Sequence, residues 1–141
     1  KWANSLTASG YAARWNSTGL FVIYAAENCS LACLENLVHR NGFGNDSDYS
    51  LLTISFPITI KTIEIYSKDL PKDWNNATEN GHLICRTIGD TWIRNQKSAI
   101  LFVPSAIIPN EKNVLINPNH PDFKKIKFAT QPFAFDKRLA K

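Results

Sequence analysis

A guanidinium, a phenol and a carboxylate lie in or beside the most apolar stretch of this 141-residue sequence. The stretch is "ARWNSTGLFVIYAAENCSLACLENLVH", and it contains Arg14, Tyr24 and Glu35. A guanidinium near an apolar strand suits a bound phosphate or carboxylate. A carboxylate turned into an apolar environment needs a cation, hydrogen-bond donors or a wet cleft. The combination therefore marks a candidate polar pocket.

Glu35 is predicted to lie on the inner face of a helix. Leu31, Leu34, Glu35 and Val38 follow the i, i+3, i+4, i+7 spacing of a single helical stripe. Two interpretations remain open for such a carboxylate: a structural ion pair with an arginine, or an acid at the floor of a pocket. The neighbouring Arg14 and Tyr24 favour the pocket.

Tyr24 and Ser105 come late in, or directly after, apolar runs. The run Leu20–Ala26 predicts a strand buried on both faces, and a parallel strand would carry Tyr24 toward the sheet edge where ligands bind. Ser105 follows Pro104 at the end of "AILFVPS", a second buried strand. Each also has a plain structural interpretation, a core tyrosine and a turn serine.

The elements that must position these residues predict one mixed α+β domain over residues 1–141. A helix begins at an Asn28 or Ser30 cap and runs to about Arg40, before "NGFGND" breaks it. Further strands are predicted in "YSLLTISFPI", "TIKTIEIYS", "NVLINP" and "KIKFA". The segment "LPKDWNNATENG" is a polar connection, "TIGDTWIRN" a short helix, and "PFAFDKRL" closes the domain.

Composition excludes several classes of protein. Apolar residues make up 44% and charged residues 20%, as in globular proteins. The apolar runs fall far short of the ~20 residues of a membrane span, and no signal segment opens the chain, so a cytoplasmic location is expected. The net charge of +4 comes from scattered basic residues, apart from "KKIK" and "KRLAK". This pattern favours a solvated basic tail over a nucleic-acid-binding face.

The cysteines and histidines do not predict a metal site. Cys29, Cys33 and Cys85 lack paired Cys-x-x-Cys spacing, and Cys29 and Cys33 suit small buried apolar positions on the helix. The three histidines, at positions 39, 82 and 120, are far apart in the sequence, and no H-E-x-x-H or G-x-G-x-x-G pattern occurs. His120 in "NPNHPD" has two interpretations, an acid or base and a hydrogen-bonded turn. Glu27 is a second carboxylate near the apolar stretch.

Taken in order, several segments resemble the RES-domain family, which is named for an arginine, a glutamate and a serine. They are "RWN…VIYAAE…LACLE", "LPKDW", "IGDTWI", "VPS…NVLINPNHPDF" and "PFAFDKRL", and they cover nearly the whole chain. The resemblance implies a fold similar to ADP-ribosyltransferases and the toxin half of a bacterial type II toxin–antitoxin pair. Such a toxin cleaves the nicotinamide–ribose bond of NAD by hydrolysis, phosphorolysis or ADP-ribosyl transfer. The implied partners are NAD as substrate and not as cofactor, inorganic phosphate or a protein acceptor, and a helix-turn-helix antitoxin.

By that resemblance Arg14, Glu35 and Ser105 match the catalytic residues, and all three bind NAD together with Tyr24. Glu35 would stabilise the positive charge on the ribose, and Arg14 would hold the pyrophosphate or orient Glu35. Tyr24 would pack against nicotinamide, and Ser105 would donate to a phosphate or the carboxamide. This sequence departs from the family in having Ala12-Ala13 where a glycine pair is usual. A further strand carrying another arginine is expected before Lys1.

Two other functions are compatible with the residues. The chain could be a RES-like binding or interaction module without catalysis, or a basic nucleic-acid binder. Release of nicotinamide from NAD separates the enzyme from the binding module, and steep salt-dependent DNA binding would indicate the third.

Overall fold

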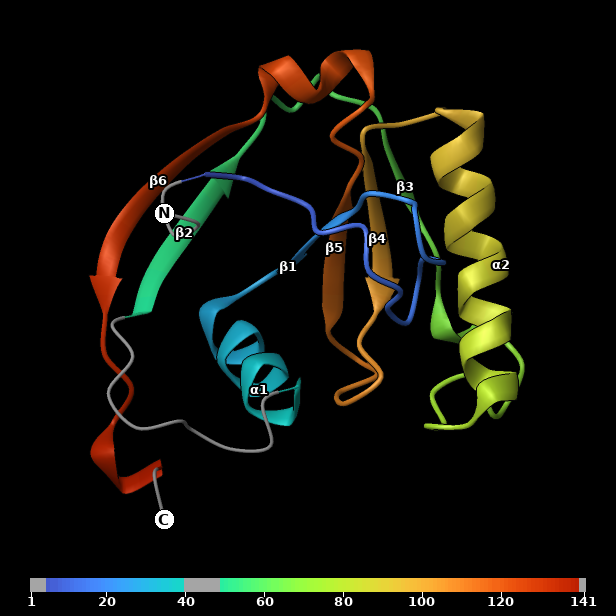
Figure 1. The fold of residues 1–141 in the computed structure, drawn as a ribbon, viewed down its shortest axis with the longest axis horizontal. Coiled ribbons are helices and arrows are strands. Elements are labelled where there is room, and N and C mark those ends of the chain that lie inside the picture. The colour runs from blue at the N-terminus through green and yellow to red at the C-terminus, as the bar shows by residue number, and fades with distance from the viewer. Residues whose placement is uncertain (1–4, 40–48, 140–141) are drawn as a thin grey trace.

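The computed structural model describes residues 5–39 and 49–139. Its larger sheet has the strand order β1-β5-β4-β3 (Figure 1). These strands are β1 (Ile23–Ala26), β3 (Thr62–Glu64), β4 (Ile100–Pro104) and β5 (Lys112–Ile116). β5 is antiparallel to both of its neighbours, and β3 is parallel to β4. Together with two helices and a second sheet, this confirms the predicted α+β class.

The second sheet is an antiparallel pair of strands, β2 (Tyr49–Ser55) and β6 (Lys127–Phe133). Figure 1 shows this pair on the side of the molecule away from helix α2, with β1 between it and the rest of the larger sheet. Three short 3₁₀ helices complete the described chain, at Ser67–Asp69, Pro121–Lys125 and Lys137–Leu139. The strands predicted from the sequence are therefore present, although β3 is only 3 residues long.

Helix α2 (Glu79–Asn95) is longer than the short helix predicted over "TIGDTWIRN". Thr78 caps its first turn, because the Thr78 side chain accepts a hydrogen bond from the N–H of Gly81. The first half of its buried face consists of Gly81, Cys85 and Gly89. Small residues give little hydrophobic periodicity, and for this reason the sequence pattern predicts the helix only from Thr87 and places the first three residues of α2 in the polar connection.

The core lies on both faces of the larger sheet. Between the sheet and α2, a cluster includes Trp15, Trp74, Trp92, Leu101, Val103 and Leu115. On the other face, a second cluster includes Ile23, Ile60, Ile100, Val114, Ile116 and Ile126. Burial on both faces explains the uninterrupted apolar sequence of β4.

The prediction for the first strand was wrong in three respects. The strand is Ile23–Ala26 and not Leu20–Ala26, it is antiparallel to β5, and it forms one edge of the larger sheet. Tyr24 is 41% exposed, so the strand is not buried on both faces. An apolar run does not reveal whether one edge of its strand is left without a paired neighbour.

Helix α1 (Cys29–His39) follows β1 closely. Asn28 is its cap, since the side-chain oxygen of Asn28 accepts a 2.8 Å hydrogen bond from the N–H of Leu31. The predicted break at "NGFGND" lies outside the described residues. All three cysteines are free thiols; Cys85 is buried and Cys33 partly so, but Cys29 is exposed, against the prediction. Across the described ranges, neither helix has the length and apolar character of a membrane span.

Candidate active site

Glu35 lies on the side of α1 that faces the larger sheet. Its side chain is 19% exposed, and Leu31, one turn earlier, is buried. Val38, one turn later, is 53% exposed, so the predicted inward stripe is wrong for the last turn of the helix. The inward placement predicted for Glu35 is confirmed, and part of its side chain remains exposed.

One oxygen of the Glu35 carboxylate is held by two donors from neighbouring strands. Oε1 accepts hydrogen bonds from the Ser105 hydroxyl at 2.8 Å and from the Asn113 side-chain amide at 2.7 Å. Oε2 is 3.5 Å from Nε2 of His39, whose side chain is 76% exposed. Within residues 5–39 and 49–139 no arginine pairs with this carboxylate; Arg40, which follows α1, lies outside the described residues.

Ser105 is fully buried directly after β4. Besides donating to Glu35, its hydroxyl oxygen accepts hydrogen bonds from the N–H groups of Ile107 and Ile108, each at 3.1 Å. A serine hydroxyl has one donor and two acceptor positions. All three positions of the Ser105 hydroxyl are occupied by groups of the protein. The hydroxyl therefore serves to hold Glu35 in place.

Arg14 lies apart from this pair. Its Nη1 donates to the backbone carbonyls of Trp74 at 3.1 Å and Asn76 at 3.3 Å. In the described part of the chain the guanidinium contacts neither Glu35 nor any other carboxylate. The structure therefore brings Ser105 to Glu35 and places Arg14 against the segment that precedes α2.

Tyr24 connects β1 to the loop that carries Arg14. The Tyr24 hydroxyl donates to the side-chain oxygen of Asn16 at 2.7 Å and accepts from the N–H of Trp15 at 3.1 Å. Burial of this hydroxyl raises the pKa of Tyr24 well above its ordinary value. The phenol therefore stays protonated and continues to donate at neutral pH.

A buried carboxylate that the sequence interpretation missed holds the same loop from α2. Asp90 is 8% exposed and accepts two hydrogen bonds from Ser17, one from the N–H at 2.8 Å and one from the hydroxyl at 2.5 Å. Arg86, one turn earlier, donates from Nε to the carbonyl of Ala13 at 2.9 Å. A partial signal was available, since the segment "IGDTWI" places Asp90 close to Ile88, Trp92 and Ile93 on the same helix.

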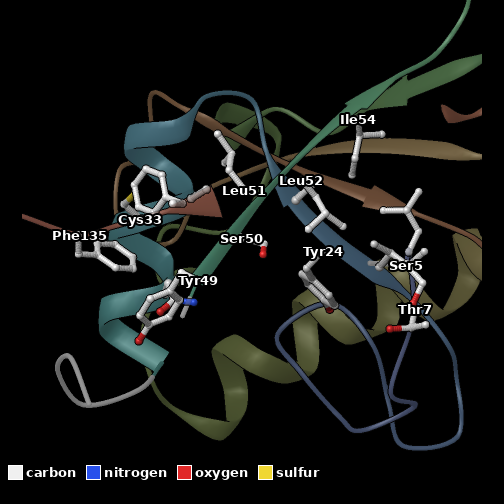
Figure 2. A pocket seen from close by; sticks show the side chains of 16 residues that line it. Ser5, Thr7, Tyr24, Cys33, Tyr49, Ser50, Leu51, Leu52, Ile54 and Phe135 are labelled. Carbon is white, nitrogen blue, oxygen red and sulfur yellow. The ribbon is translucent and has the colours of Figure 1, made fainter. Parts of the chain in front are cut away.

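An apolar cavity of about 350 Å³ separates β1 and α1 from the β2–β6 pair. Figure 2 shows Tyr24, Ser5 and Thr7 on one side of this space and Tyr49, Phe135 and Cys33 on the other. The cavity is within the size range of small-molecule sites. Glu35 does not line it, but its neighbours on α1 do: Ala32, Cys33 and Asn36.

A second hollow, of about 420 Å³, lies next to the first and shares part of its wall. The shared residues come from β1, α1 and β2, and they are Ala25, Ala32, Leu51, Leu52 and Ile54. Together the two spaces run along the unpaired edge of β1. An elongated ligand could therefore contact both.

The other candidate polar residues have structural contacts. Nδ1 of His120 accepts from the N–H of Asp122 at 3.0 Å, so its proton is on Nε2, which lies 3.0 Å from the carbonyl of Gln96. This confirms the hydrogen-bonded turn. Glu27 is exposed and accepts from the N–H of Lys112 at 2.9 Å. Over the described ranges, no three potential metal-ligating side chains cluster.

The fold and site define a small α+β protein with an inward-turned glutamate fixed by a serine, beside an apolar cavity. The chain belongs to the RES domain family, whose model matches residues 2–137. It is 40% identical over 116 residues to the "Prs ADP-ribosylating toxin" of Sphingobium sp. (strain YBL2), covering 81% of this chain and 71% of that protein. It is 38% identical over 136 residues to "Toxin Res" of Yersinia enterocolitica, covering 94% and 86%. A "Toxin Res" of Photorhabdus laumondii is 39% identical over 134 residues, covering 93% and 83%.

Proposed function

We propose that this protein is a toxin that consumes NAD by cleaving the bond between nicotinamide and ribose. The relatives named as toxins, one of them ADP-ribosylating, support the toxin role. The observation that carries the chemistry is the hydrogen bond from Ser105 to Oε1 of Glu35, which fixes a partly exposed side chain on the helix whose residues Ala32, Cys33 and Asn36 line a ligand-sized cavity. The toxin would act in the bacterial cytoplasm and be neutralised by a cognate helix-turn-helix antitoxin.

Cleavage of the nicotinamide–ribose bond depends more on a negative charge near the ribose than on a proton donor for the leaving group. The nicotinamide ring of NAD is cationic and leaves as a neutral molecule, taking the electron pair of the broken C–N bond with it. The ribose left behind resembles an oxocarbenium ion, which a carboxylate stabilises. Water, phosphate or a protein side chain then forms a bond to the anomeric carbon and gives up a proton. Oε2 of Glu35, which accepts from neither Ser105 nor Asn113 and lies 3.5 Å from the exposed His39, would take this role.

The remaining site residues bind the substrate in this proposal. The ring of Tyr24 forms part of the cavity wall and would pack against nicotinamide. Arg14 uses Nη1 on two backbone carbonyls and also contacts the Cys85 side chain, which orients the guanidinium; its remaining N–H groups would bind the pyrophosphate. Ser105 would act through Glu35 and not on the substrate.

Nicotinamide release tests the proposal. The purified protein is incubated with NAD, with and without phosphate, and nicotinamide and the ADP-ribose product are identified by chromatography and mass. We expect release by the wild type and loss of release in Glu35→Gln, while Glu79→Gln, which removes an exposed carboxylate on α2, keeps it. The absence of release above blank from the wild type would favour the non-catalytic binding module instead.

A further inference from the structure

We propose that Asn113 is a positioning residue for Glu35, acting as the second of two donors that orient the carboxylate for the cleavage of NAD. This inference rests on the proposed function. Its basis is the 2.7 Å hydrogen bond from the Asn113 side-chain amide to Oε1, the same oxygen that accepts from Ser105. Neither the family name nor the sequence interpretation singled out Asn113.

The backbone of Asn113 is held from both sides. It is in β5, opposite Ala26 of β1 and Val103 of β4. β1 leads within three residues into α1, which carries Glu35, and β4 leads directly to Ser105. The two donors therefore project from neighbouring strands of one sheet toward one side chain of the helix. A site built on paired strands holds its groups more accurately than one built on loops.

The arrangement separates the roles of the two carboxylate oxygens. Oε1 is saturated by two donors from the sheet, whereas Oε2 has a 3.5 Å approach from a largely exposed histidine. Rotation of the carboxylate would break both hydrogen bonds at Oε1 at once. Asn113 and Ser105 thus keep Oε2 turned away from the sheet, in the orientation that the developing ribose cation requires.

Asn113→Asp is the sharpest test because the change is nearly isosteric. It replaces the donating amide by a carboxylate oxygen that faces Glu35 at hydrogen-bonding distance. Asn110→Asp is the matched control, since Asn110 is exposed in the same β4–β5 connection, makes no contact with Glu35, and undergoes the same change of charge. Asn113→Ala removes the donor without adding a charge.

We expect Asn113→Asp to lower the kcat of nicotinamide release about 10- to 100-fold, as the loss of a hydrogen bond to a charged group predicts. The KM for NAD should stay within about twofold, because the substrate-binding groups are unchanged. Asn113→Ala should show a smaller fall in kcat, and Asn110→Asp should match the wild type. A kcat for Asn113→Asp that equals the wild-type or Asn110→Asp value would overturn the positioning role.

A thermal-denaturation cycle measures the same contact without turnover. Asn113→Asp should lower the Tm because it places a second negative charge next to Glu35. In a Glu35→Gln background this repulsion is absent, so the decrease in Tm should shrink by more than about half. An equal decrease in both backgrounds would show that the two residues are not coupled, and would refute the inference. If the wild type releases no nicotinamide, the proposed function fails and the positioning role fails with it. An active wild type with an unaffected Asn113→Asp variant refutes the positioning role alone.

Discussion

Ser105 donates its hydroxyl to Oε1 of Glu35 over 2.8 Å, although the two residues are 70 positions apart in the sequence. The bond joins the end of β4, a strand in the middle of the larger sheet, to the second turn of α1. Because Ser105 also accepts two backbone N–H groups, its own position is fixed by the turn after β4. The orientation of the carboxylate is thus set by the sheet.

Ser105→Ala should therefore affect both stability and turnover. The substitution removes one donor from Glu35 and leaves the N–H groups of Ile107 and Ile108 without their acceptor. We expect the free energy of unfolding to fall by about 1–3 kcal/mol in urea denaturation. Nicotinamide release should fall as well, whereas Ser30→Ala, at an exposed position of α1, should change neither. Turnover equal to the wild type in Ser105→Ala would show that Glu35 does not depend on this donor.

Tyr24→Phe should change how stability depends on alkaline pH. Although 41% of Tyr24 is exposed, its hydroxyl is buried and hydrogen-bonded, and burial raises its pKa. The unfolded chain then loses this proton first as the pH rises through about 10, so the free energy of unfolding falls from there upward. Phenylalanine has no such proton.

The measurement is the Tm at intervals between pH 8 and about pH 11. The decline in Tm should be steeper for the wild type than for Tyr24→Phe, even though the variant starts lower because it lacks the hydrogen bonds to Asn16 and Trp15. Tyr11→Phe, at a position that is 79% exposed, should follow the wild-type slope. Parallel slopes for the wild type and Tyr24→Phe would contradict the burial of the hydroxyl.

The sequence predicted the placement of Glu35 better than the placement of its partners. Helical spacing located the carboxylate on an inner face, and the cost of burying it required partners. Naming Asn113 as a partner needed the register of β5 against both β1 and β4, which local patterns do not contain. The spacing was misleading at Val38, which is 53% exposed.

The contacts of Arg14, which lies in a loop, also could not be predicted from local sequence patterns. Its residue type predicts a polar contact, but the observed contacts are backbone carbonyls at Trp74 and Asn76, about 60 residues away along the chain. Backbone carbonyls are present at every residue, so no sequence signal marks them as partners. The length of α2 was missed for a related reason, because Gly81 and Gly89 contribute no apolar side chain to its buried face.

Asp90→Asn should loosen the loop that carries Arg14. Both oxygens of the Asp90 carboxylate accept hydrogen bonds from Ser17, one from its N–H and one from its hydroxyl. The amide of the variant has an NH₂ group in place of one oxygen, and this group cannot accept the hydrogen bond that the oxygen accepted. We expect the free energy of unfolding to fall by about 1–3 kcal/mol and the KM for NAD to rise, since Arg14 is three residues from Ser17. Asp69→Asn, an exposed substitution with the same change of charge, should leave both values unchanged. An unchanged KM in Asp90→Asn would separate the loop from substrate binding.

Gly89→Ala should destabilise the protein, although alanine is favoured over glycine inside a helix by about 1 kcal/mol. A Cβ at position 89 would overlap the backbone carbonyl oxygen of Trp15, so α2 and the loop could not approach as closely as they do. Overpacking of this kind costs about 1–3 kcal/mol, which exceeds the gain in helix propensity. The Tm of Gly89→Ala should therefore be lower than that of the wild type, and Thr87→Ala, at an exposed position of the same helix, should stay close to it. A raised Tm in Gly89→Ala would mean that the loop is not in contact with α2 in solution.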